Sequence, residues 1–336
     1  MLEQKKYVRL MFSLVLFLVA LIFIALCAGR FSANPVDVLN AFITKLHKTP
    51  GNQAMENVVF LIRIPRIAAA ILIGAALSVS GAVYQSTFRN PLVSPDLLGV
   101  SSGASMGAAI AILLGLHMRL IQLFAFCGGI AAVMLASALP KILRNSSNMM
   151  LVLSGIIVSG FMNSVLGITK FFAEEQSELA SIVFWQMGSL ASINTTQILS
   201  VMPTIVICLI VLLMIAWRLN ILSFGEQEAK TVGVNVPGLR GVAVICASLL
   251  TASAVCISGT IGWIGLIIPH FGRLICGSDN TKLLPATIFL GGSFLLIIDT
   301  FARTATSMEI PLSILSGIIG APLYAWLLYR QKAKII

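Results

Sequence analysis

Charged residues are scarce in this sequence of 336 residues. Only 10% are Asp, Glu, Lys or Arg, whereas 58% are hydrophobic, and the mean hydropathy is +1.00. Soluble domains are about a quarter charged, so the composition excludes an ordinary soluble domain. The apolar runs are too long for the alternating pattern of a membrane β-barrel. We therefore predict an all-α polytopic membrane protein, built as one transmembrane unit over residues 1–336.

Residues that commonly build reactive sites are also few. The six cysteines stand singly in apolar runs without a Cys-x-x-Cys pair, and the three histidines, His47, His117 and His270, are far apart. Each cysteine is most simply a small buried hydrophobe. Nor is there a Walker A glycine-lysine motif, so the chain cannot hydrolyse ATP by that route. We predict no metal site, no cofactor and no enzymatic activity.

Ten apolar runs are present instead, and a membrane-spanning helix needs about 20 apolar residues. The first run follows Lys5, Lys6 and Arg9, is longer than the apolar part of a signal peptide and lacks a clear cleavage site, so we predict a retained span. The runs cover residues 10–28, 66–87, 96–116, 120–139, 149–170, 195–217, 239–258, 260–276, 283–302 and 311–329.

The basic residues predict how these runs are oriented. Ten crossings with a cytoplasmic N-terminus place fourteen of the 22 Lys and Arg residues in the cytoplasm and eight on the other side. This asymmetry follows the positive-inside rule and predicts that both termini are cytoplasmic. Topology and anionic lipid explain much of the net charge of +10, so nucleic acid is not an expected partner.

Two sequence matches suggest an internal repeat. Val79-Ser80-Gly81 recurs 178 residues later as Ile257-Ser258-Gly259, and the same offset carries Pro91 onto Pro269 and Gly99 onto Gly277. Residues 153–157 recur 162 residues later as residues 315–319. In the predicted topology the first copy begins outside and the second inside. We predict an inverted repeat with halves at about 57–171 and 235–330, an arrangement common in transporters.

The second run is bracketed by polar features. Arg63-Ile64-Pro65-Arg66 precedes it, and Asn90-Pro91 follows it. Charged groups are costly in lipid, and broken backbone is tolerated there only against protein or a water-filled cavity. These brackets therefore indicate a polar path through the membrane and hence transport.

The fifth run carries small or polar residues at every fourth position. They are Gly155, Ser159, Asn163 and Gly167, which share one helix face. Such faces commonly serve close helix packing. A dimer or pathway face is the other interpretation, and the two can coexist.

The cytoplasmic segment between the sixth and seventh runs predicts a short surface helix. Ser223 and Glu226 fit a capping box, Gly233 is suited to end the helix, and Pro237 to begin the next one. Such a helix suits insertion into a groove of another protein. The alternative is an ordinary connector.

Seven ordered blocks resemble one family, the permease subunits of ABC importers for iron–siderophores, haem and cobalamin (FecCD-type permeases of type II importers). The resemblance covers about residues 10–330. The blocks are Arg63–Arg66, Gly74–Gly81, Phe88–Leu92, Leu98–Gly103, Gly225–Gly233, Gly262–Arg273, and Glu309-x-Pro311 with Gly320-Ala321-Pro322.

The resemblance implies a ten-span permease in the cytoplasmic (inner) membrane of a bacterium or archaeon. Its implied partners are a second permease copy, most simply as a homodimer, two cytoplasmic ATPase subunits, an extracytoplasmic substrate-binding protein and the lipid bilayer.

The resemblance also implies roles for particular residues. Arg63, Arg66 and Arg303 would meet acidic residues of the binding protein, although Asp299 could instead pair with Arg303 four residues later. The residues implied in coupling to the ATPase are Gly225, Glu226, Ala229 and Gly233. The residues expected at the gate or along the pathway are Asn90, Leu92, Ser147, Asn148, Ser159 and Asn163.

The alternative function is an ion-coupled secondary transporter, which can also have inverted repeats. Such transporters usually need ionisable groups in mid-membrane, whereas Asp96 and Asp299 lie near the ends of their runs. For an importer, iron–siderophore is the expected cargo because it is the commonest in the family. Haem, cobalamin and molybdate remain open.

Overall fold

The computed structural model describes residues 2–29, 31, 33–47, 52–144, 147–306 and 308–332, and within these ranges it contains helices but no strand. The prediction of an all-α polytopic protein is confirmed. A helix lies at each of the ten predicted apolar runs. These helices are α1 (Leu2–Cys27), α4 (Ile64–Phe88), α5 (Val100–Leu113), α6 (Met118–Ile142), α7 (Asn148–Phe172), α9 (Thr195–Met214), α12 (Val236–Ser258), α13 (Ile264–Cys276), α14 (Asn280–Thr304) and α15 (Leu312–Lys332).

The ten helices are not equally long. Seven segments are long and apolar enough to cross a membrane, and one of these joins α4 to the helical turns before it. By contrast, α5, α13 and the described part of α15 are shorter apolar helices. Irregular backbone next to the short helices α5 and α13 is therefore placed at membrane depth, where it must be enclosed by protein.

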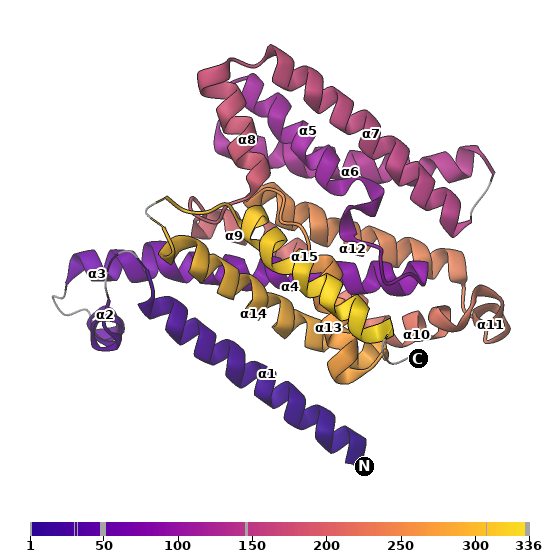
Figure 1. The fold of residues 1–336 in the computed structure, drawn as a ribbon, viewed down its shortest axis with the longest axis horizontal. Helices are drawn as coiled ribbons and strands as arrows, with labels where there is room; N and C mark the ends of the chain where they lie inside the picture. Colours follow the sequence, from indigo (N-terminus) through magenta and orange to yellow (C-terminus); the bar gives the residue numbers. More distant parts are fainter. Residues whose placement is uncertain are drawn as a thin grey trace.

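Short elements lie at both ends of the bundle. Figure 1 shows α2 and α3 at one end, and α10, α11 and both chain termini toward the other. An even number of membrane crossings places the two chain termini on the same side. The short elements are α2 (Pro35–His47), α3 (Gln53–Asn57), the π-helical turns η1 (Val58–Arg63) and η3 (Glu175–Leu179), the 3-10 turn η2 (Pro95–Leu98), α8 (Ala180–Met187), α10 (Ala216–Phe224) and α11 (Glu226–Thr231).

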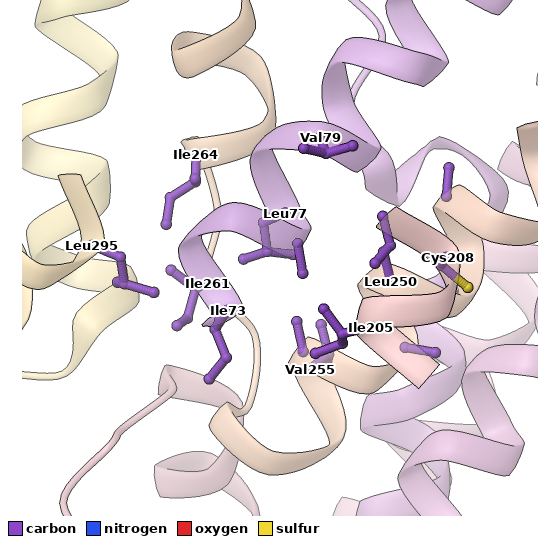
Figure 2. Close-up of a cluster of buried hydrophobic side chains, with 14 of the residues drawn as sticks. Ile73, Leu77, Val79, Ile205, Cys208, Leu250, Val255, Ile261, Ile264 and Leu295 are labelled. Carbon is purple, nitrogen blue, oxygen red and sulfur yellow. The ribbon is translucent and has the colours of Figure 1, made fainter. Parts of the chain in front are cut away.

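The centre of the bundle is α4, which packs against α12, α13 and α14. Figure 2 shows Ile73 and Leu77 of α4 in the buried core, with Ile205 of α9 and Leu250 of α12 close by. An added Cβ on Gly81 would lie 1.9 Å from the carbonyl oxygen of Gly265. Apolar burial therefore stabilises this centre, and small residues let the backbones approach.

Buried hydroxyls add polar contacts between α4 and α12. The Ser80 hydroxyl donates to the Ala247 carbonyl at 2.8 Å and lies 2.8 Å from Thr251 Oγ1. One turn further on, the Tyr84 and Ser248 hydroxyls are 2.6 Å apart. In an apolar interior each hydroxyl needs such a partner, so these pairs fix how the two helices face each other.

Two sets of four consecutive helices have a similar order of lengths. The set α4 to α7 has 25, 14, 25 and 25 residues, and the set α12 to α15 has 23, 13, 25 and 21. The packing follows the same order, because α4 contacts α13 and α14 while α12 contacts α5 and α6. The structure thus contains two sets of four helices with reciprocal packing.

The first sequence match does not join equivalent points of these sets. Ser80-Gly81 lies inside α4, two turns before its end, whereas Ser258-Gly259 ends α12, where Gly259 has φ +69°. Glycine is needed for close helix approach at the first place and for a left-handed backbone at the second. The offset of 178 therefore joins different parts of the two helices. The offset of 162 joins similar parts, since residues 153–157 and 315–319 lie near the start of α7 and α15.

Three linkers are hydrogen-bonded together at the end of the bundle opposite α11. The Ser189 amide after α8 donates to the Ser258 carbonyl at 2.8 Å, and the Leu312 amide at the start of α15 donates to the Gly188 carbonyl at 3.0 Å. The Thr260 hydroxyl also donates to the Gln186 carbonyl. Gly188 and Gly259 have φ +72° and +69°, which favour glycine. This linker junction joins the ends of α8, α12 and α15.

Candidate functional site

Arg66, at the start of α4, lies at the centre of a buried ionic cluster. Its Nε donates to the Asp299 carboxylate at 2.9 and 3.0 Å, and its two terminal nitrogens each donate to a Glu309 oxygen at 2.9 Å. Arg66 is 4% exposed and Asp299 is 0% exposed. The guanidinium therefore joins α4, α14 and the segment before α15 through charge-assisted, forked hydrogen bonds.

The other two arginines predicted to meet a binding protein are also turned inward. Arg303 donates to the Ala25 carbonyl at 2.5 Å, and Arg63 donates to the carbonyls of Leu26, Cys27 (3.2 Å) and Phe31 (2.6 Å). Cations near the C-terminal carbonyls of a helix are favoured by hydrogen bonds and by the helix dipole. Both side chains thus fasten the end of α1 to the bundle.

The alternative pairing of Asp299 with Arg303 is present but weak. Arg303 Nε lies 3.9 Å from Asp299, whereas Arg66 lies 2.9 Å from the same carboxylate. Sequence spacing offered the local pair as the alternative and gave no sign of Arg66, because the stronger contact joins residues 233 positions apart. The sequence signal for the contact between Arg66 and Glu309 was that each belongs to a block of the same family pattern.

At the opposite end, Gly225 separates α10 from α11. Its φ of +150° and ψ of 158° turn the chain, and an added Cβ would lie 1.8 Å from Glu228 Oε2. The predicted capping box at Ser223 is wrong, because Ser223 lies inside α10 and donates to the Asn220 carbonyl at 2.6 Å. Gly233, with φ +81°, follows α11 as predicted, and α12 has its proline in the first turn.

The helix α11 has a buried side and an exposed side. Ala229 is fully buried, and Glu226 forms an ion pair with Arg240 of α12. The structure therefore uses these two predicted coupling residues to seat α11 on the bundle. The outward positions are Gln227, Glu228, Lys230 and Thr231, flanked by Phe224 and Val232, which are 74% and 65% exposed.

The turn after α4 holds the first predicted gate residues. Arg89 ends α4 with φ +54°, and Asn90 Oδ1 accepts a hydrogen bond from the Leu92 amide at 2.9 Å. An asparagine side chain that bonds backbone two residues on is typical of a turn. Leu92 is 59% exposed, so it projects from this turn at the surface of the single chain.

The remaining gate and pathway residues lie on α7. Ser147 caps the helix by accepting from the Met150 amide at 3.2 Å. Asn148 is the first helical residue, and its side chain falls outside the described part of the structure. Further along, Asn163 and Gly167 are exposed.

Gly155 and Ser159, on the same face, pack against the segment around η2. A Cβ on Gly155 would lie 2.1 Å from the Leu97 carbonyl oxygen, and a Cβ on Gly99 would lie 2.9 Å from Ser159 Oγ. The face of small residues is thus divided. Its first half serves close packing, and its second half is open in the single chain.

No described residues form a group of three or more His, Cys, Asp or Glu side chains that could hold a metal ion. The described His270 is buried, and neither of its ring nitrogens has a hydrogen-bond partner. Its ring centroid lies 5.9 Å from that of Tyr324, at a steep angle.

Comparisons with known proteins agree with this architecture. The molybdate import system permease protein MolB of Haemophilus influenzae is 36% identical over 330 residues, covering 98% of both chains. A probable iron chelatin transport system permease protein of Helicobacter pylori is 41% identical, covering 83% of this chain and 84% of its own. A solved metal-chelate type ABC transporter in an inward-facing conformation matches with a TM-score of 0.87 and 36% identity, over 96% of this chain and 99% of the other. The model of the FecCD transport family matches residues 17–330, and the chain belongs to that family.

Proposed function

We propose that this chain is the permease subunit of an ATP-driven importer that moves a metal chelate into the cytoplasm. The observation that carries the proposal is α11, a short helix at the end of the bundle opposite the Arg66 cluster (Figure 1). Its inner side is fixed by the buried Ala229 and by the ion pair between Glu226 and Arg240 of α12. A protein bound to the exposed side of α11 could therefore move α12. Membership of the FecCD family supports a permease, and the relatives' names support import.

Two further partners follow from the same proposal. The chain lacks a Walker A motif, so a separate ATPase subunit would dock on α11. A second copy of the chain would cover α7 and α15, where Phe161 is 61% and Ile318 is 66% exposed. Placing Asn163 near that contact would let the two copies line one pathway between them.

For the extracytoplasmic binding protein we retain the proposal of contact at Arg63, Arg66 and Arg303. Arg66 and Arg303 lie against the carboxylates of Asp299 and Glu309, whereas Arg63 donates to backbone carbonyls. Three cations and two carboxylates leave one excess positive charge, which favours an acidic partner. The Glu309 side chain is 29% exposed and is the accessible member of the cluster. Direct contact with the arginines requires that Glu309 gives way.

The alternative of an ion-coupled secondary transporter has less support. Such a transporter needs an intramembrane carboxylate that can exchange its ion. Asp299 is instead held by the permanently charged Arg66, and Asp96 accepts a hydrogen bond from Ser101.

For the cargo we propose an iron–siderophore chelate. The named relatives handle different cargoes, molybdate in one case and an iron chelate in the other. The open half of the α7 face offers small and neutral polar groups, which suit passage of an intact chelate. Recognition would then belong mainly to the separate binding protein.

Uptake by reconstituted vesicles tests this proposal. The permease is assembled with its ATPase and binding protein, and labelled ferric siderophore, haem, cobalamin and molybdate are compared with and without ATP. We expect ATP-dependent uptake of the ferric siderophore. Uptake that runs on an ion gradient without the ATPase contradicts the importer, and ATP-driven uptake of another cargo corrects only the substrate.

A further inference from the structure

The segment between α1 and α4 contains an amphipathic helix that the transport proposal does not use. This helix, α2, buries Val38 and Ala41 toward the protein and exposes a second apolar face. The exposed face consists of Val36 (64%), Leu39 (60%), Phe42 (40%), Ile43 (51%) and Leu46 (80%). Their spacing of three and four residues places them on one side of the helix, next to the polar Asn40 and His47.

The direction of α2 differs from that of the spanning helices. In Figure 1 α1, α4 and α14 run across the view, whereas α2 is seen end-on. The axis of α2 is therefore steeply inclined to theirs. If the long helices cross the membrane, α2 lies close to the membrane plane, as interfacial amphipathic helices do.

A groove of about 630 Å³ lies in the corner between α1 and α2. Its wall is almost entirely apolar and includes Phe23, Ile24 and Ala28 from the end of α1 and its exit, and Leu39 and Phe42 from α2. The volume is within the range of small-molecule pockets. The described residues that line the groove carry no charged side chain, so its wall matches a hydrocarbon group.

The length of α1 indicates where the groove lies relative to the hydrocarbon core of the membrane. The apolar run over residues 10–28 measures roughly 28 Å at 1.5 Å per residue, close to the roughly 30 Å of a bilayer's hydrocarbon core. The lining residues from 23 to 28 thus lie in the outer part of that core, on the side away from α11. Hydrocarbon chains of lipids end in headgroups just beyond this level.

The neighbouring surface identifies the occupant. Along α1, Phe12 (71%), Leu16 (60%) and Phe23 (65%) are exposed apolar residues, and α1 lies at the edge of the bundle (Figure 1). Phe23 belongs both to this exposed apolar surface and to the wall of the groove, and the wall continues onto Leu39. We propose that α2 is embedded in the membrane leaflet opposite α11, and that the groove between α1 and α2 holds an acyl chain of a phospholipid.

Fluorescence quenching by brominated lipids tests the position of α2. The four native tryptophans all lie outside α1 and α2. The fluorescence of an added tryptophan is therefore obtained by subtracting that of the parent protein. In vesicles of brominated phosphatidylcholine we expect Leu39→Trp to lose most of its added fluorescence. Asn40→Trp, one position along on the polar face, should keep most of its signal. Equal quenching of both variants, or no quenching of Leu39→Trp, overturns the in-plane helix.

Native mass spectrometry tests the groove separately. Ala28→Phe fills it, and Ala131→Phe makes the same change on the exposed surface of α6. We expect Ala28→Phe to lose a phospholipid that the parent and Ala131→Phe retain. Retention of the same number by all three proteins overturns the acyl-chain site. Crosslinking of position 39 to protein in place of lipid, in the reconstituted permease with its partners, assigns the face to a protein contact and overturns the lipid proposal.

Discussion

Asp299 has no exposed side-chain surface and faces two guanidinium groups, those of Arg66 and Arg303. Removal of one member of a buried ion pair leaves an uncompensated charge, which commonly costs 3–5 kcal/mol. Glu309 contacts the same Arg66 but is 29% exposed, so water can partly replace it. Loss of the Asp299 carboxylate therefore leaves buried positive charge uncompensated, whereas water can partly replace the carboxylate of Glu309.

We expect Asp299→Asn to lower the free energy of unfolding by about 3–5 kcal/mol, because it leaves two buried cations with one remaining carboxylate. Glu309→Gln should cost about 1 kcal/mol, as for other partly exposed ion pairs. Thermal unfolding of the purified variants in detergent measures both. Equal melting temperatures for the two variants would contradict the buried role of Asp299.

Asp279 lies outside the spans, in the turn before α14, where its carboxylate accepts from the Asn220 side chain at 2.6 Å and from the Thr281 amide at 2.9 Å. Partial burial acts against the charged form, but the hydrogen bonds from Thr281 and Asn220 prevail and lower the pKa of Asp279. A lowered pKa in the folded state stabilises the fold above the unfolded value of about 3.9.

This contribution should be lost as the pH falls from about 3.9 through the lower pKa of the folded protein. Asp279→Asn should keep the helix cap and be less stable than the parent above that window, with the difference narrowing within it. Unfolding midpoints between neutral and acidic pH give the comparison. A constant difference between the two proteins across the whole range would argue against the assigned hydrogen bonds.

The arginines show what the sequence could indicate at this scale. Arg63 and Arg66 were recognisable as important because charge at the mouth of a span is costly. Their inward orientation was not predictable, since Arg66 pairs with carboxylates that lie more than 200 residues later. Local spacing suggested only Arg303 as an alternative partner for Asp299, whereas the folded chain pairs it mainly with Arg66.

Among the elements, α4 depends on close contact with α13. An added methyl at Gly81 would lie 1.9 Å from a backbone oxygen, which cannot move as a side chain can. We expect Gly81→Ala to destabilise the protein by about 1–3 kcal/mol through overpacking. Gly160, in the middle of α7, has no atom within 4 Å of such a methyl and provides the control.

Gly160→Ala should be neutral or stabilising by about 0.5–1 kcal/mol, because alanine favours the helix. Thermal unfolding compares the two variants. If Gly81→Ala is as stable as Gly160→Ala, the two backbones are not in contact and the arrangement of α4 and α13 is wrong.

The two sides of α11 give a second contrast between variants. If the exposed side contacts an ATPase, Gln227→Trp and Thr231→Trp should reduce transport-coupled ATP hydrolysis several-fold without changing the melting temperature. Ala229→Trp should lower the melting temperature, because position 229 is fully buried. ATPase assays of the assembled transporter, with unfolding curves of the permease alone, separate the effects. Normal coupling in both outward variants would exclude α11 as the contact.

Helix positions were predictable from sequence because long apolar runs have few structural solutions in a membrane. Helix ends were less predictable from the sequence. Ser223 fits a capping motif, yet α10 continues past it and Gly225 makes the turn. The repeat shows a similar limit, since one Ser-Gly pair serves helix packing and the other ends a helix.

For the whole molecule, the proposed division of labour predicts weak cargo binding. The open half of the α7 face offers Asn163 but no described cluster of metal ligands. We expect the purified permease alone to bind ferric siderophore far more weakly than the binding protein does. Equilibrium dialysis with each protein measures the two affinities. Tight binding by the permease would contradict passive passage.

The class of the whole protein could be predicted because ten apolar runs and seven motif blocks occur in order along one chain. Cargo and partners could not be, because their contacts lie on other chains or on exposed surface. The inclination of α2 was also not predictable. Its pattern of apolar residues fits any half-buried helix, and only its direction relative to α1 separates a membrane-plane helix from a packed one (Figure 1).

The linker junction has a mechanical consequence. Backbone hydrogen bonds hold Gly188 and Ser189 to α15 and α12. At the same time, Ile182 of α8 is buried in a small apolar cluster with Ala109 of α5 and Leu166 of α7. The helix α8 therefore connects α12 and α15 to α5 and α7, and a displacement of α15 would be passed on to α5 and α7 through it.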